Sequence, residues 1–484
     1  MTAPLSAAEV SMLAQDGPGS TAHVGMVHLL GEGSGGLDHD GLLDLVADRI
    51  SYVPRYRQRV RSVPGQLAGP IWVDDAGFDL RFHVRRTTLP GPGTLGQLHE
   101  LVGELMSGPL DRSRPLWELY LVRGLEGDHS ALVTKTHPSL VDGVDTVDLA
   151  QVLLDAGDTS TGGTSAAWHP QPEPTSAELL ARAAWRAAQD PLAAVQGAAG
   201  LLRAATQVAG TAGATLVGRT TPPRPPAPQP PGARRASARA SLCGPVSAGR
   251  RCALLSAPLA DLRAVRRRHG HPLHDAVLAA VTGGLRRWLL GGGERLFAHA
   301  QLTALVPMAV VDEGDQPTAL GCCVVPWLQR LPVGEPDPLA RLHLLAYGTR
   351  AHRSTGRAVS ADTLLATPGF AAPTLHAVGV RGAFEPSYDL LVSSAPGSPE
   401  LVSAAGHPLA ASYPMLPLVT EHRLSIGVTS YRDEVHLGLA ADERLDLDRL
   451  VEGLRESLTE LRGLGAAGPR PGIARRSRTV GGRR

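Results

Sequence analysis

A proline-dense segment near the middle of the chain divides the sequence into two parts. Seven of the twelve residues 220–231 are proline, which fixes φ and lacks an N–H group, so this run neither continues a helix nor pairs as a strand. A chain of 484 residues is also too long for a single hydrophobic core. We therefore expect four segments: an N-terminal lobe over 1–175, an Ala-rich helical connector and extended spacer over 176–240, a C-terminal lobe over 241–465, and a basic, disordered tail over 466–484.

Both lobes alternate strand-like and helix-like patterns of apolar residues, which predicts an α/β fold in each. No repeat of 20 to 50 residues is visible, which argues against a solenoid. The expected strands cover 23–30, 130–136 and 302–311, with two more within 423–439, and the expected helices cover 37–52, 95–106, 273–290 and 446–464.

Charge and cysteine content exclude several classes of protein. The net charge of +1 provides no field that would attract nucleic acid. The four cysteines form no C-x-x-C pair, so neither a zinc site nor a disulfide framework is expected. The N-terminus lacks the charged and apolar regions of a signal peptide, and no run of eighteen apolar residues occurs. These features predict a cytoplasmic protein whose contact with lipid, if any, is peripheral.

Residues 131–143 carry the clearest chemical signal, because a buried strand runs there into a turn that ends at Gly143. His137 and Asp142 stand five residues apart at this junction, as in many active-site loops. A structural histidine is the alternative, since a chain with 18 histidines contains such a pair easily by chance.

Several short motifs follow one another in a fixed order along the chain. They are Pro115-Leu116-Trp117, His137-Pro138-Ser139-Leu140-Val141-Asp142-Gly143, His274-Asp275-Ala276-Val277-Leu278-Ala279 and Ser393-Ser394-Ala395-Pro396-Gly397. Together they resemble the bacterial wax ester synthase/diacylglycerol acyltransferase family. The resemblance runs from the first residues to about residue 464, interrupted by the spacer.

The resemblance implies two chloramphenicol-acetyltransferase-like lobes with a tunnel at their interface, where ligands commonly bind. It implies acyl-CoA as co-substrate, no other cofactor, and a diacylglycerol or fatty alcohol as acyl acceptor. Lys135, the only lysine, is a candidate for binding a phosphate of the acyl carrier, and an ordinary strand-end lysine is the alternative. The expected substrate-binding residues are Pro115, Leu116, Trp117, Lys135, His274, Asp275 and Ser394.

The chain departs from the family pattern at its centre. The family motif has two adjacent histidines, and the second, which is the general base, aligns with Pro138. Proline has no titratable group and therefore cannot accept a proton. His137 matches the first histidine and is a possible substitute base, although strand alternation points it to the opposite face unless a bulge re-aims it. Asp142 is expected to structure the loop.

Three functions remain open from the sequence. The first is acyl-CoA-dependent O-acyl transfer that makes triacylglycerol or wax ester. The second is a catalytically impaired relative that binds acyl chains or lipid surfaces, or acts as a partner protein. The third is transfer to an unusual acceptor, with the base supplied by His137 or by the substrate.

Other features bear on ligands and location. His269, His271 and His274 lack a clear fourth metal ligand, so we expect no metal site, and Asp275 is expected to cap a helix start. The Ala-rich stretch 176–218 either lies on a membrane or lipid inclusion or packs across the two lobes. The arginines of 470–484 offer a second contact with anionic lipid. The oligomeric state stays open.

Overall fold

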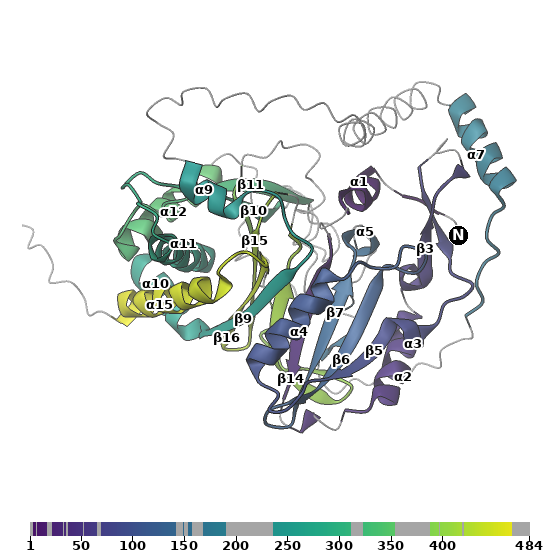
Figure 1. Ribbon diagram of the computed structural model, residues 1–484, viewed down its shortest axis with the longest axis horizontal. Coiled ribbons are helices and arrows are strands. Elements are labelled where there is room, and N and C mark those ends of the chain that lie inside the picture. Colours follow the sequence, from purple (N-terminus) through teal and green to yellow (C-terminus); the bar gives the residue numbers. More distant parts are fainter. Residues whose placement is uncertain are drawn as a thin grey trace, which may run out of the picture.

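The protein folds into two lobes, each built around a β-sheet, and the lobes lie side by side (Figure 1). The computed structural model describes residues 3–5, 7–16, 22–31, 33–34, 37–51, 53–64, 69–141, 149, 153–156, 168–189, 236–310, 323–353, 388–395, 397–418 and 421–466. This arrangement confirms the predicted two-lobed α/β fold.

The N-terminal lobe contains a seven-stranded sheet in which the predicted site follows a central strand. The strand order is β5 (Val84–Thr88), β6 (Trp117–Leu125), β7 (His129–Thr136), β2 (Val24–Leu30), β14 (His407–Met415), β13 (Val402–Ala404) and β8 (Asp155–Ala156). A smaller sheet joins β1 (Ala3–Pro4), β4 (Ile71–Asp74) and β3 (Gln58–Arg61). Strand β7 is thus paired on both sides, by β6 and β2, which holds its C-terminal end in a fixed position.

Helices cover both faces of this sheet. The apolar side of α2 (His39–Ile50) contributes Leu42 and Val46 to one core, together with Trp117 of β6. On the opposite face, α4 (Leu95–Ser107) begins at a capping box in which Thr94 and Gln97 satisfy each other's backbone N–H groups. The other helical segments described up to residue 189 are α1 (Ala7–Gln15), η2 (Pro54–Arg57), α3 (Leu80–His83), α5 (Pro138–Val141) and α7 (Ser176–Gln189).

The C-terminal lobe has a six-stranded sheet with helices on its outer side (Figure 1). The strand order is β11 (Cys323–Leu331), β10 (Leu302–Val310), β12 (Leu390–Ala395), β15 (Leu424–Tyr431), β16 (Glu434–Asp442) and β9 (Arg250–Pro258). The helices are α9 (Ala236–Leu242), α10 (Leu259–His269), α11 (Leu273–Gly291), α12 (Pro338–Arg353) and α15 (Leu447–Ala466).

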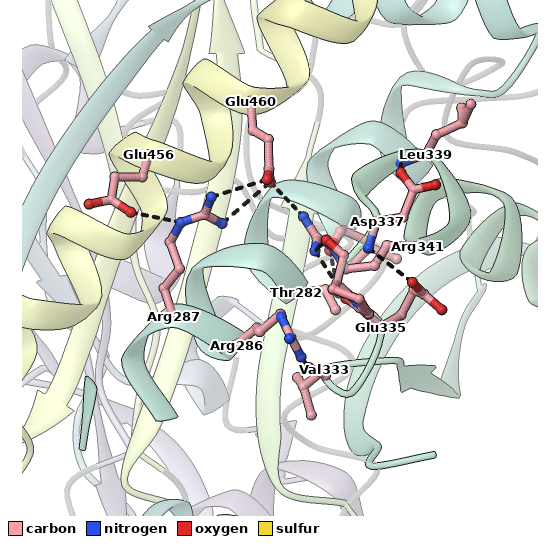
Figure 2. Close-up of polar contacts among 12 residues, drawn as sticks. Thr282, Arg286, Arg287, Val333, Glu335, Asp337, Leu339, Arg341, Glu456 and Glu460 are labelled. Atoms are coloured by element: carbon pink, nitrogen blue, oxygen red, sulfur yellow. Dashed lines mark hydrogen bonds and ion pairs between the residues drawn. The ribbon is translucent and has the colours of Figure 1, made fainter. Parts of the chain in front are cut away.

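An ion-pair network joins three of these helices (Figure 2). Glu460 of α15 accepts hydrogen bonds from Arg287 of α11 and, at 2.6 Å, from Arg341 of α12. Only 1% of the Arg341 side chain is exposed, and its other amino group donates to the carbonyl oxygens of Glu335 and Pro336. These contacts pair both terminal amino groups of the buried guanidinium, which matters because an unpaired charge in the interior is strongly destabilising.

The two lobes are joined by a strand that crosses between them and by a helix that covers a sheet edge. Strand β14 follows C-terminal elements in sequence yet pairs with β2 of the N-terminal sheet. The carbonyl oxygen of Pro414 in β14 lies so close to Gly427 and Gly438 that an added Cβ would be 2.6 Å and 2.1 Å from it. At the edge of the C-terminal sheet, His99 Nε2 of α4 accepts a hydrogen bond from the Leu254 N–H of strand β9.

Most predicted elements lie where the sequence placed them. Strands β2, β7 and β10 and helices α2, α4, α11 and α15 confirm the ranges expected from periodicity, and the two strands expected in 423–439 are β15 and β16. Within the Ala-rich stretch the structure describes α7, whereas 190–218, the spacer 220–231 and the tail 467–484 lie outside the described residues. None of the described helices combines the length and apolar character needed to cross a bilayer.

Candidate active site

The predicted motif lies where β7 ends and α5 begins. Pro138 is the first residue of α5, a position that suits proline because its fixed φ matches the helix and its missing N–H is not needed there. The proline ring keeps the preceding residue, His137, out of helical geometry, and His137 lies between the end of β7 and the start of α5. Pro138 therefore acts as a helix start, and the imidazole at this site belongs to His137.

His137 is buried and held from three directions. Its backbone N–H donates to the Leu116 carbonyl oxygen at 2.9 Å, so the Pro-Leu-Trp segment anchors it. Its Nδ1 accepts the Ser139 backbone N–H at 3.1 Å and lies 2.6 Å from the Ser139 hydroxyl oxygen. Its Nε2 lies 3.4 Å from Asp16 Oδ2.

These contacts define the tautomer of His137. Because Nδ1 accepts a backbone N–H, it carries no hydrogen in the neutral ring, and the hydrogen is on Nε2, facing Asp16. The Ser139 hydroxyl oxygen lies 2.6 Å from the same nitrogen and so shares its one lone pair with the backbone N–H. This arrangement leaves Nδ1 able to accept a proton in a reaction.

Asp16 is a member of the site that the sequence did not single out. It follows α1, which packs next to α5 (Figure 1). Burial alone would raise the pKa of Asp16, but the adjacent His137 ring and the hydrogen bond from the Ala22 N–H outweigh it and lower the pKa to about 2. The carboxylate is therefore ionised at neutral pH and is suited to orient the His137 ring.

His23 occupies the position next to His137 on the neighbouring strand. Val24 pairs with Thr136 at the end of the two strands, and His23 and His137 flank this pair and lie close enough to interact electrostatically. Both ring nitrogens of His23 are buried and have no hydrogen-bond partner among the described residues. Burial, followed by the charge of Lys135, lowers the pKa of His23 to about 3, so the ring is neutral at pH 7. The charge of Arg250 in β9 of the other lobe contributes too, which indicates that the cluster lies near the lobe interface.

Lys135 is not placed to bind a phosphate. Only 2% of its side chain is exposed, and Nζ donates to the Gly108 carbonyl oxygen at 2.5 Å and lies 3.6 Å from Glu118 Oε2. Glu118 also accepts from the Tyr120 hydroxyl and pairs with Arg85. Burial lowers the pKa of Lys135, and Glu118 opposes that effect. The phosphate-binding hypothesis is therefore replaced by a buried ion pair between strands β6 and β7.

The Pro115-Leu116-Trp117 segment lies in the N-terminal core. Trp117 is fully buried, stacks on His83 at 4.6 Å between ring centroids, and donates its indole N–H to the Tyr56 carbonyl oxygen. Leu116 is 1% exposed. We infer that this segment, predicted to touch substrate, instead positions His137 through the Leu116 carbonyl.

The remaining predicted residues form a second group in the C-terminal lobe. His274 Nδ1 lies 3.2 Å from the Ser394 hydroxyl oxygen, so the structure brings these two together. Asp275 lies in the first turn of α11, but its carboxylate accepts from the Thr349 hydroxyl of α12 at 2.7 Å, and the N-cap residue is Pro272. The expectation that Asp275 caps the helix is thus corrected to a link between α11 and α12. Asp142 and Gly143 lie outside the described residues.

Two of the three histidines considered for a metal site, His269 and His271, lie near His343. The rings of His269 and His271 are 6.4 Å and 5.2 Å from that of His343, measured between centroids. Within the described part of the chain, no three His, Cys, Asp or Glu side chains are arranged to hold a metal ion.

Comparison with known proteins assigns the chain to a family. The family model described as the wax ester synthase/diacylglycerol acyltransferase catalytic domain matches residues 5–277, and its C-terminal domain model matches 321–462. Two proteins of Mycobacterium tuberculosis, each named "probable diacylglycerol O-acyltransferase", are similar to the chain. One is 41% identical over 183 residues, which cover 38% of this chain and 68% of the relative, and the other is 29% identical over 441 residues, which cover 88% of each.

Solved structures support the same fold. The wax ester synthase/diacylglycerol acyltransferase from Marinobacter aquaeolei VT8 matches 96% of this chain and all of its own with a TM-score of 0.63 and 24% identity. The starter condensation domain of rhizomide synthetase matches 96% of this chain and 95% of its own with a TM-score of 0.53 and 13% identity. Because the catalytic-domain model alone covers more than half of the sequence, the chain belongs to the wax ester synthase/diacylglycerol acyltransferase family.

Proposed function

We propose that the protein transfers a long-chain acyl group from acyl-CoA to the hydroxyl of a diacylglycerol or a fatty alcohol. The products are a triacylglycerol or a wax ester together with coenzyme A, and the reaction uses no metal or further cofactor. Family membership and the names of the relatives support this substrate class. The tunnel between the lobes, expected from the family, would admit the two substrates.

The observation that carries the proposal is the environment of His137. Its ring is buried, its Nε2–H faces the ionised carboxylate of Asp16, and its Nδ1 is free of hydrogen. A base held in this way removes the proton that the reaction must lose when the ester forms. With Pro138 in place of a second histidine, His137 is the imidazole of the motif that can serve as the base.

A thiol-release assay tests the proposal. Purified full-length protein is mixed with a long-chain acyl-CoA, and free coenzyme A is followed with and without diacylglycerol or fatty alcohol supplied in liposomes. We expect release that depends on the acceptor, with the matching triacylglycerol or wax ester as product. Release that never exceeds the protein-free background, with either acceptor, contradicts the proposal.

Flotation of the same mixture tests peripheral contact with a lipid surface. Helix α7 exposes Leu180 and 68% of Trp185, which supports such contact because exposed apolar side chains on a helix favour binding at a lipid surface. The protein should rise with the liposomes in a density gradient. Protein that stays at the bottom, with or without acceptor, argues that α7 does not bind lipid.

A further inference from the structure

Three histidines and one arginine lie together in the C-terminal lobe. His269 is the last residue of α10, and His271 lies two residues before α11 begins. His343 and Arg350 belong to α12. The centroid of the His343 ring is 5.2 Å from that of His271 and 6.4 Å from that of His269, and the charge of Arg350 acts on His271. We call these four side chains the cationic cluster.

The cationic cluster has no acidic partner among the described residues. Burial lowers the pKa of His271, and the charges of the other three members lower it further, so every charge that acts on this ring is positive. Asp275, four residues after His271, is buried, and its carboxylate accepts a hydrogen bond from the Thr349 hydroxyl at 2.7 Å. Neither His343 nor Arg350 forms an ion pair with another described residue. Positive charge that is left uncompensated attracts an anion and repels a metal cation.

Two members of the cluster are open to solvent and can touch a ligand directly. Both His343 and Arg350 are exposed. The guanidinium of Arg350 has five N–H donors in a planar fork, a shape that matches two oxygens of a phosphate. His271 is partly buried, and both of its ring nitrogens lack a hydrogen-bond partner among the described residues, so no such bond fixes this ring.

An exposed aromatic ring lies between the two cluster members of α12. Tyr347 follows His343 by four residues and precedes Arg350 by three, so the three side chains share one face of the helix. Tyr347 is 74% exposed, and Leu344 on the same face is 51% exposed. Aromatic side chains that are apolar on one side and polar at the tip suit ligands that combine both characters. This face therefore fits a phosphate with a flat or apolar group attached to it.

The stability of the helices explains only part of the cluster. The three arginines at 266–268 lie in the last turn of α10, and Arg350 lies in the last turn of α12, where the helix dipole favours positive charge. His343 lies in the first half of α12, and His271 lies beyond the end of α10, so the dipole accounts for neither.

We propose that His343 and Arg350, with His271 beside them, bind a phosphate ester group, while Tyr347 packs against the part of the ligand next to that phosphate. Two ligands share this chemistry: coenzyme A, whose phosphates adjoin an adenine ring, and an anionic phospholipid, whose phosphate adjoins apolar chains. The proposed site lies in the C-terminal lobe, whereas His137 belongs to the N-terminal lobe. The inference does not depend on acyl transfer.

Binding measurements on the full-length protein test the site with one probe for each source of phosphate. Isothermal titration calorimetry measures the affinity for coenzyme A. Flotation measures binding to phosphatidylcholine liposomes with and without added phosphatidylglycerol. Arg350→Gln and His343→Gln should each weaken binding of at least one probe on the order of tenfold, because each removes a hydrogen bond to a charged group. Tyr347→Ala should weaken binding of the same probe a few-fold, although it removes no charge.

Arg295→Gln is the matched control, because it removes one exposed arginine from the same lobe. Arg295 follows the C-terminal end of α11, and this helix has 19 residues, so its two ends lie about 28 Å apart. The control should bind both probes as the unmodified protein does. Circular dichroism and the thermal midpoint should show that all variants fold.

The pattern of losses identifies the source of the phosphate. A loss for coenzyme A alone assigns the site to a free nucleotide ligand, and a loss for phosphatidylglycerol liposomes alone assigns it to a lipid headgroup. The proposal is overturned if neither probe binds the unmodified protein, if both bind Arg350→Gln and His343→Gln unchanged, or if Arg295→Gln weakens binding equally. Thiol release is not measured, so failure of the proposed transfer reaction leaves this test intact.

Discussion

Replacing His137 with alanine should lower acceptor-dependent coenzyme A release by about 10²- to 10⁴-fold, which corresponds to about 3 to 5 kcal/mol of activation barrier. In the proposed reaction His137 is the proton acceptor, and its side chain is fully buried near Asp16 and Ser139. By contrast, Pro138→Ala should change the rate only a few-fold, since Pro138 has no titratable group and serves as the first residue of α5. The comparison uses initial rates at saturating acyl-CoA and acceptor.

The two substitutions are adjacent in sequence, so each controls for general damage to the turn. Circular dichroism and the thermal midpoint should confirm that both variants fold. If Pro138→Ala abolishes turnover and His137→Ala leaves it intact, the assignment of the base to His137 is wrong.

Acidification should lower the free energy of unfolding strongly, because three histidines are buried in the folded protein. Burial lowers the pKa of His23 to about 3, with a further contribution from Lys135, and lowers the pKa of His28 and of His436 to about 4. In the unfolded chain these rings titrate near 6.5. Between these pKa values the unfolded state binds more protons than the folded state. The contribution of the three neutral rings to the free energy of unfolding is therefore fully present above pH 6.5 and is lost as the pH falls toward 4.

The expected loss is on the order of 5 kcal/mol between pH 6.5 and pH 5, since each histidine contributes about 1.4 kcal/mol per pH unit. Asp16 does not contribute in this range, because its carboxyl titrates near pH 2 when folded and near 3.8 otherwise. Urea unfolding at closely spaced pH values measures the slope.

A histidine substitution isolates one of these contributions. His436→Gln keeps a polar partner for the Ser256 hydroxyl, which lies 2.8 Å from His436 Nδ1, and should reduce the slope by about 1.4 kcal/mol per pH unit. The same substitution at exposed His169 serves as the control. An unchanged slope in His436→Gln means that this ring does not titrate as described.

Local patterns in the sequence predicted much of the fold. The apolar periodicity of α11 and α15 is helical along their whole length, and β7 is a run of apolar and β-branched residues between polar ends. Helices and strands of this kind can be predicted because their pattern depends on residues that are neighbours in the sequence. The Pro-Leu-Trp and His-Pro motifs also come together, because β6 and β7 are neighbouring strands whose ends meet.

Features that depend on distant contacts were not predictable in this way. Nothing in the local pattern of β14 indicates that it leaves the C-terminal sheet to pair with β2, since both sheets offer it an apolar face. Asp16 lies about 120 residues before His137 and belongs to no motif, so only the packing of α1 against α5 reveals it. The burial of Lys135 likewise depends on Glu118 of the adjacent strand.

The central proposal is that this protein transfers acyl groups with His137 as its base and that Pro138 takes no part in proton transfer. The most direct measurement compares initial rates of acceptor-dependent coenzyme A release by the unmodified protein and by its Pro138→His variant. We predict clear release by the unmodified protein and at most a few-fold change in the variant. Release at background by the unmodified protein, with turnover appearing only in Pro138→His, would contradict the claim.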